Sequence, residues 1–167
     1  MDILGYFFRF LSEIRKEKRD ENSLRILLKI EIDSNTQYLI NFYDDLFENS
    51  IDEPYLLASK LVIKDLIEIK NPIWLNKTIL TAQALKEEEI NEINSFYQTM
   101  NKCLKIQLDL IKLKEQEEEY DNNRNYIHLG DTRRVFTLNS YDKWYSFKGS
   151  YTKAIEKGDS LVNRLKK

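Results

Sequence analysis

The sequence has almost none of the residues from which the common metal, redox and nucleophile sites are built. It contains one cysteine, Cys103, and one histidine, His128. One cysteine cannot close a disulfide within the chain, and it suits a reducing compartment. Two candidate ligands are too few for a zinc site, and a di-iron helical bundle needs two histidines. We therefore predict no metal and no other cofactor, and a cytoplasmic location.

The usual catalytic motifs are missing as well. No Gly-rich phosphate loop, Gly-x-Ser-x-Gly, His-Glu-x-x-His or Cys-x-x-Cys occurs in the sequence. A catalytic pair of Cys103 and His128 would need the two side chains side by side, and no pattern in the sequence brings them together. The sequence therefore offers no catalytic residue, and it favours a protein that is not an enzyme.

Glycine and proline are scarce too, at four and two residues, which is little turn punctuation for an all-β protein. The chain is 42% hydrophobic and 32% charged, which is typical of a folded domain. The net charge of −2 gives no electrostatic reason to bind nucleic acid. We predict one all-α domain over residues 1–167, a bundle of five to six helices without a nucleic-acid partner.

What the sequence does contain is helical periodicity, most clearly between Leu24 and Leu46. Apolar residues recur there in steps of three and four, and Glu31 and Asn35 occupy two positions of that stripe. Buried polar side chains need hydrogen-bond partners, and we expect donors such as Trp74 and Tyr97 to supply them. This would be a structural network that fixes helix register. The alternative is a desolvated Glu31 that binds or abstracts something.

The other helices are read from the same pattern and from their start signals. A helix is predicted from Ser23, its N-cap, to about residue 48, and others begin at Pro54 and Pro72. The helix at Pro54 is apolar around much of its circumference, which predicts a place at the centre of the bundle or wedged between neighbouring helices. A spine helix of about residues 87–120 should pack antiparallel to the helix from Ser23. The last helix should start near residue 139 or 140.

Two features of the last helix carry expectations of their own. Gly158 interrupts its stripe, which predicts a close approach to another helix. Its aromatic residues recur at helical spacing beside Arg133 and Arg134, and we interpret them as a core face rather than a stacking surface for bases. These aromatic residues are Tyr141, Trp144, Tyr145, Phe147 and Tyr151.

The N-terminal residues 1–19 combine an apolar stripe with a basic cluster. The stripe is too short to span a membrane, and Arg9 interrupts it. It either packs on the bundle or forms a peripheral amphipathic helix that contacts a membrane surface or a partner groove. The stripe consists of Ile3, Leu4, Phe7, Phe8, Leu11 and Ile14, widened by Tyr6 and Phe10, and the cluster of Arg15, Lys16, Lys18 and Arg19.

Three short motifs resemble those of a loose group of uncharacterised bacterial and archaeal helical proteins. They are Glu31-Ile32-x-x-Asn35 on a long helix, Trp74 at the start of a short one, and Glu89-Ile90-x-x-Ile93-x-x-Phe96-Tyr97 at the start of another. The likeness covers about residues 24–115. Members of the group often carry a membrane-spanning segment ahead of the first helix, where this chain has only Ile3 to Leu11. The resemblance implies a helical bundle with a structural role for the Glu/Asn pair, and it implies no activity.

These observations lead to one expectation of function and one alternative. We expect a non-enzymatic helical interaction or scaffold module that binds a protein partner or itself, because the chain supplies helix surface but no reacting group. The alternative is a bundle that binds a small molecule, or an enzyme of unfamiliar type, with Glu31 in a pocket.

Overall fold

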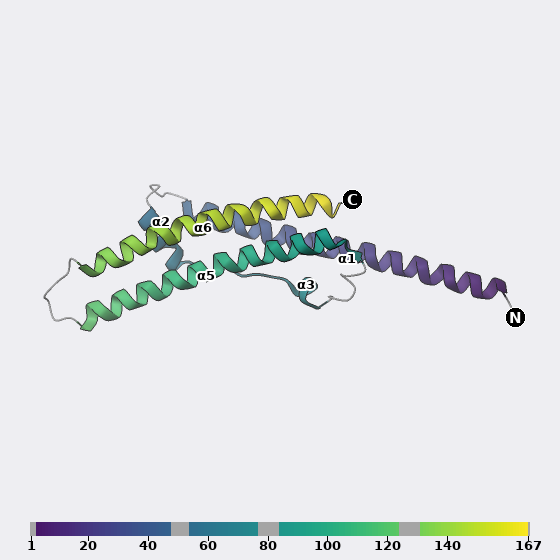
Figure 1. Cartoon of the computed structure of the whole chain (residues 1–167), viewed down its shortest axis with the longest axis horizontal. Helices are drawn as coiled ribbons and strands as arrows, with labels where there is room; N and C mark the ends of the chain where they lie inside the picture. The colour runs from purple at the N-terminus through teal and green to yellow at the C-terminus, as the bar shows by residue number, and fades with distance from the viewer. Residues whose placement is uncertain (1–2, 48–53, 77–83, 124–130, 167) are drawn as a thin grey trace.

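Helices account for almost all of the structure, a computed structural model described over residues 3–47, 54–76, 84–123 and 131–166 (Figure 1). These residues form five helices and no strand, which confirms the predicted all-α bundle. The helices are α1 (Ile3–Phe47), α2 (Pro54–Ile63), α3 (Pro72–Asn76), α5 (Glu87–Asn123) and α6 (Asp131–Arg164). The predicted spine is α5, with 37 residues and three glutamates in its first turn, where negative charge complements the helix dipole.

The three long helices α1, α5 and α6 form the body of the bundle (Figure 1). Helix α6 runs antiparallel to α1 and to α5, and its packing against α5 is the most extensive between any two described helices. Helices α1 and α5 run in the same direction, because Arg25 meets Glu89 and, further along both helices, Glu31 meets Tyr97. The predicted antiparallel pairing of α5 with α1 is therefore wrong. Helix α2, residues 64–71 and α3 first carry the chain back along α1.

Two predicted helix starts are also wrong. Helix α1 is continuous through Ser23, whose hydroxyl donates a hydrogen bond to the carbonyl of Arg19 at 2.8 Å instead of capping a new helix. Helix α6 begins at Asp131, about two turns earlier than expected, with an aspartate where helix starts favour one. The segment without regular pattern is thus shorter than predicted, and His128 lies outside the described residues.

The core lies where α1, α5 and α6 meet, and its largest fully buried side chains include Trp144, Phe96 and Phe147. Of the five aromatic residues predicted to form the core face of the last helix, Trp144, Phe147 and Tyr151 are buried in this core, whereas Tyr141 and Tyr145 are 40% and 60% exposed. On α5 the helical spacing predicts a buried row through Ile93, Tyr97, Met100, Leu104 and Leu108, and the first three are buried, but Leu108 is 38% exposed. Beyond Met100 the buried residues are Cys103, Ile106, Gln107 and Leu110.

Helix α2 packs against three helices, α6, α5 and α1, as a helix wedged between neighbours would. Leu57, Ala58 and Leu61 are fully buried, but Leu56 and Ile63 are exposed, so α2 is not enclosed on every side. An exposed apolar face of this kind is a feature that function has to explain.

Gly158 marks a close approach of α6 to α1 and α5 in the bundle core. A Cβ atom at this position would collide with Oγ1 of Thr36 on α1 and come within 3.1 Å of the Phe96 ring on α5. Only hydrogen fits there, so the prediction of a close helix approach at Gly158 is confirmed. Gly149, two and a half turns earlier on α6, has open space around it.

The N-terminal part of α1 projects past the ends of α5 and α6 (purple in Figure 1). Among the α1 residues whose side chains are described, the first buried one is Leu24, and we call residues 3–23, which come before it, the extension. At about 1.5 Å per residue the extension is roughly 30 Å long. Its backbone points away from the other described helices instead of running along them. Within the described residues, no helix has the length and apolar character that crossing a membrane requires.

Candidate functional site

The structure brings Glu31 into contact with the start of α3 and with α5. Its Oε2 accepts a hydrogen bond from the backbone N–H of Ile73 at 2.6 Å. Its Oε1 accepts one from the N–H of Trp74 at 3.3 Å and one from the hydroxyl of Tyr97 at 2.6 Å. Helix α3 begins at Pro72, which has no N–H, so Glu31 satisfies the first two amide donors of that helix. Glu31 therefore caps α3 from another helix.

Asn35, one turn after Glu31, holds the residues that precede α3. Its side-chain oxygen accepts from the N–H of Lys70 at 3.0 Å, and its amide nitrogen donates to the carbonyl of Lys70 at 2.6 Å. The same nitrogen donates to the carbonyl of Glu31 at 3.0 Å. The amide thus pairs with both backbone groups of Lys70, as a neighbouring strand would. Glu31 and Asn35 together fasten residues 70–74 to α1.

Trp74 and Tyr97 complete this group. Their rings stack with centroids 6.4 Å apart, and Trp74 contributes its backbone N–H rather than an indole donor to Glu31. Burial, together with the hydrogen bond to the Glu31 carboxylate, raises the pKa of Tyr97 well above its ordinary value. The phenol therefore keeps its proton and acts as a donor to Glu31.

Gln107 also binds backbone groups at a helix end, here the end of α2. This role was not predicted from the sequence. Its amide nitrogen donates to the carbonyls of Leu61 at 3.1 Å, Asp65 at 3.0 Å and Lys64 at 3.4 Å. Its oxygen accepts from the N–H of Ile67 at 3.0 Å. Carbonyls at a helix end have no partner within the helix, so this fully buried amide caps α2. The buried row of α5 beyond Met100 contains the signal that could have found Gln107.

A third polar contact fixes the start of α5 against α1. The guanidinium of Arg25 binds both carboxylate oxygens of Glu89, at 2.7 and 3.0 Å, and also the carbonyl of Ala84 at 3.2 Å. Glu89 in turn accepts from the N–H of Lys86 at 2.9 Å, which is the backbone half of a capping box. Burial alone would raise the pKa of Glu89, but these hydrogen bonds and the charge of Arg25 hold it below its ordinary value.

Most of these polar side chains are hydrogen-bonded to backbone groups, so few of their polar atoms remain to contact a substrate. All the polar contacts above hold the connecting segment (residues 64–76) or the start of α5 in place. Within the described residues, no group of three His, Cys, Asp or Glu side chains could hold a metal ion. Burial raises the pKa of the Cys103 thiol to about 12, so it is not a nucleophile at neutral pH. The pairing of Cys103 with His128 falls outside the described residues.

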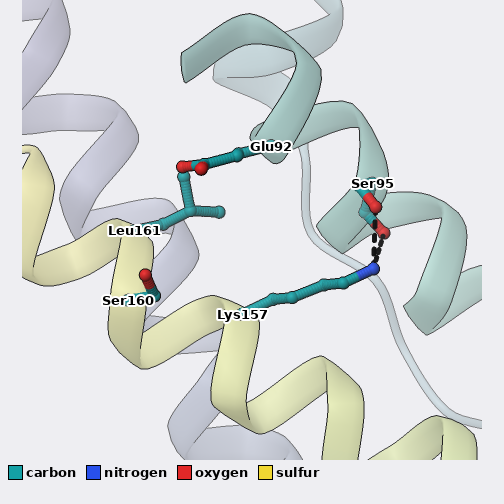
Figure 2. A pocket seen from close by; sticks show the side chains of 5 residues that line it. All are labelled: Glu92, Ser95, Lys157, Ser160 and Leu161. Carbon is teal, nitrogen blue, oxygen red and sulfur yellow. Dashed lines mark hydrogen bonds between the residues drawn. The ribbon is translucent and has the colours of Figure 1, made fainter. Parts of the chain in front are cut away.

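A depression of about 210 Å³ lies elsewhere, between α5 and α6 (Figure 2). The ammonium group of Lys157 donates there to Ser95 Oγ at 2.7 Å, to Thr99 Oγ1 at 3.0 Å and to the Ser95 carbonyl at 3.4 Å. These three contacts use its three hydrogens. Glu92 Oε1 lies 2.7 Å from Arg164, and its Oε2 has no hydrogen-bond partner among the described residues. Such a depression, with one unsatisfied oxygen, defines no ligand.

No protein-family model, curated protein or solved structure matches this chain. The resemblance to the helical group with an Asn and a Glu one turn apart therefore stays a prediction. The function has to be argued from the residues and their geometry.

Proposed function

We propose that the protein is a non-enzymatic interaction module of the cytoplasm, a helical scaffold whose extension binds a protein partner or a second copy. The observation that carries the proposal is the extension itself. It is part of one continuous 45-residue helix, and its backbone stands clear of every other described element. Its sequence nevertheless has the apolar stripe of a helix that packs against something.

The extension gains little stability from the bundle, which is why it suggests a partner. Most of the stability of a helix in a protein comes from tertiary packing of its apolar face, and the backbone of the extension runs along no other described helix. Burying the apolar stripe against a partner would supply about 25 cal/mol for each Å² removed from water. Helix-in-groove packing is the usual way in which such stripes are recognised.

The polar interior supports the same proposal, because it argues against the alternative function at Glu31. Glu31 is 7% exposed, and its two oxygens together accept three hydrogen bonds from protein donors. A small-molecule site or an active site at Glu31 would need at least one oxygen directed at a ligand. The alternative function therefore lacks the open carboxylate on which it depends.

The test compares partner recovery by three forms of the full chain. Each form is crosslinked in cells and purified. The three forms are the parent, the double variant Phe7→Ser/Phe8→Ser in the extension, and the control variant Ile30→Lys. Ile30 is 58% exposed on α1 within the bundle region, so its change probes surface alteration outside the extension. We expect the parent and the control to recover the same partner, either another protein or a second copy, and the extension variant to lose it.

Equal recovery by all three forms would contradict the proposal. A small molecule that co-purifies with the parent and is lost in Glu31→Gln, at unchanged partner recovery, would favour the alternative function instead. Circular dichroism of each variant checks that the helical content is retained.

A further inference from the structure

Four side chains on α1 and α5 bind the connecting segment by its backbone. Gln107 and Asn35 each bind a backbone N–H and at least one backbone carbonyl of the segment. Glu31 accepts hydrogen bonds from two N–H groups near the end of the segment, and the Tyr38 hydroxyl accepts one from the N–H of Glu68 at 3.3 Å. We call Glu31, Asn35, Tyr38 and Gln107 the clamp. The clamp holds the backbone at intervals between residues 65 and 74.

The side chains of the connecting segment alternate as those of an extended peptide do. Ile67 is 2% exposed, and Ile69 is half-buried against the same core. Leu66, Glu68 and Lys70, which lie between and beside them, are exposed. Within the described part of the chain, residues 65–70 form no backbone–backbone hydrogen bond, and they lie between α2 and α3 as an extended chain (Figure 1). The segment is therefore an extended peptide that is bound by side chains.

The clamp makes few demands on the sequence that it binds. Its hydrogen bonds go to N–H and C=O groups, which almost every residue provides. Specificity comes from the two inward side chains, which are isoleucines one residue apart. Peptide-binding proteins that recognise extended segments work in this way, since main-chain hydrogen bonds give affinity and pockets for alternate side chains give specificity.

The clamp also needs an extended backbone beside it. Glu31, Asn35 and Gln107 are buried, at positions of α1 and α5 where apolar side chains would pack directly. Their polar atoms would lose hydrogen bonds if the connecting segment left and nothing took its place. An extended segment from another protein, with aliphatic side chains at two alternate positions, would restore the same contacts.

We propose that the clamp is a binding site for such an extended segment of a partner protein. In the free protein the connecting segment occupies this site and competes with the partner. The site does not include the extension, so this proposal goes beyond the proposed function and does not depend on it.

Few apolar contacts oppose the release of the connecting segment. Among residues 64–75, Ile67 alone is buried, whereas α2 just before them has three fully buried side chains, Leu57, Ala58 and Leu61. Segments with few buried apolar contacts open locally at a lower free energy than the whole fold does. The apparent affinity for a partner is reduced by the fraction of molecules in which the clamp is still occupied. Loosening the segment should therefore raise that affinity.

The test measures binding of a fluorescein-labelled synthetic peptide, with the sequence of residues 64–76, to full-length variants by fluorescence polarisation. Ile67→Ala/Ile69→Ala loosens the connecting segment and leaves the clamp intact. A second variant adds Asn35→Leu to this pair, and its matched control adds Asn41→Leu at an exposed asparagine of α1. A control peptide carries serine in place of both isoleucines. Circular dichroism and thermal unfolding verify that each variant folds.

We expect the peptide to bind the loosened variant at least about tenfold more tightly than it binds the parent, because the clamp is open in more molecules. Adding Asn35→Leu should weaken this binding at least about tenfold, since the backbone hydrogen bonds of that amide are lost. Adding Asn41→Leu should leave it unchanged, and the control peptide should not bind.

Three results would overturn the proposal. One is a folded loosened variant that binds the peptide no better than the parent does. Another is equal binding of the two peptides, and the third is an equal effect of Asn35→Leu and Asn41→Leu. Because none of these measurements involves the extension, each result leaves the proposed function standing.

If the loosened variant does not fold, amide hydrogen exchange of the parent tests the proposal instead. The amides of Ile67 and Lys70 should be protected at least about tenfold less than those of Phe96 and Met100 on α5, because the segment opens locally. Equal protection of the four amides would mean that the segment leaves the clamp only when the whole protein unfolds. That result would also overturn the proposal.

Discussion

Glu31 occupies a position where a leucine would continue the stripe of α1, and its carboxylate is fully used by donors from α3 and α5. The sequence pattern was enough to single out Glu31 and Asn35. Their main partners could not be predicted in the same way, because backbone groups of Lys70 and Ile73 carry no signature in the sequence. The path of the chain after α2 determines which backbone N–H groups lie next to Glu31 and Asn35 on α1.

Replacing Glu31 by alanine should destabilise the fold. The change leaves two backbone N–H groups and the Tyr97 hydroxyl without their acceptor, which costs roughly 1–3 kcal/mol of unfolding free energy. Urea unfolding measures this cost. Asp33→Ala, an exposed acid on the same helix, is the control and should change stability by less than about 0.5 kcal/mol. Equal midpoints for Glu31→Ala and the parent would show that the capping contacts do not stabilise the protein.

The two glycines of α6 give a paired prediction of opposite sign. Gly158→Ala forces a Cβ into Thr36 and Phe96, so it should destabilise the fold by about 1–3 kcal/mol. Gly149→Ala meets nothing within 4 Å and should stabilise it by up to about 1 kcal/mol, since alanine favours a helix interior. Thermal unfolding of both variants decides the matter. A stabilised Gly158→Ala would mean that α6 and α1 are further apart than described.

Glu89 should make stability depend on pH at the acid end. Because the pKa of Glu89 is lower in the folded protein than its ordinary 4.5, its ion pair contributes stability above that pH. The contribution is lost as the pH falls below 4.5 and through the folded-state pKa. Glu89→Gln removes this titration, so the stability of the variant should fall less steeply between about pH 5 and 3. If stability falls equally steeply with pH in the variant and the parent, Glu89 does not contribute to the pH dependence.

At the scale of the elements, local sequence signals correctly predicted two helix starts, at Pro54 and Pro72. They also predicted the extent of α5. The errors came from tertiary contacts. Ser23 resembles an N-cap, yet α1 continues through it because its hydroxyl finds a carbonyl one turn earlier. The buried row of α5 was misjudged beyond Met100 because Gln107 counts as polar in a pattern, yet it is buried, with hydrogen bonds to carbonyls at the end of α2 and just after it.

The connecting segment should depend on Gln107 more than on any of its own side chains. Gln107→Met keeps the size of the side chain but removes its hydrogen bonds to Leu61, Lys64, Asp65 and Ile67. We expect a loss of about 1–3 kcal/mol in urea unfolding, because buried backbone groups are left unpaired. Gln98→Met, an exposed change on the same helix, should have little effect. A Gln107→Met variant as stable as the Gln98→Met variant would contradict the capping role.

At the scale of the molecule, the parallel course of α1 and α5 follows from the connecting segment. Residues 64–76 return along α1 and are held there by side chains, so α5 starts beside Arg25 rather than at the far end. The antiparallel order of α1 and α5 was predicted because short connections usually join neighbouring antiparallel helices. The projection of the extension beyond the bundle was equally invisible in the sequence, because its apolar stripe is of the type that packs on a core.

Amide hydrogen exchange, followed by NMR on the full chain at low and high concentration, tests the central claim most directly. That claim is that the interior polar side chains hold the fold and the extension is left for a partner. In dilute solution the amides of Ile67, Lys70 and Ile73 should be protected, since each donates to a buried side chain. In dilute solution the extension should exchange fast, and slower exchange at high concentration would identify a second copy as the partner. Rapid exchange at those three amides, or an extension that is as protected as they are in dilute solution, would contradict the account.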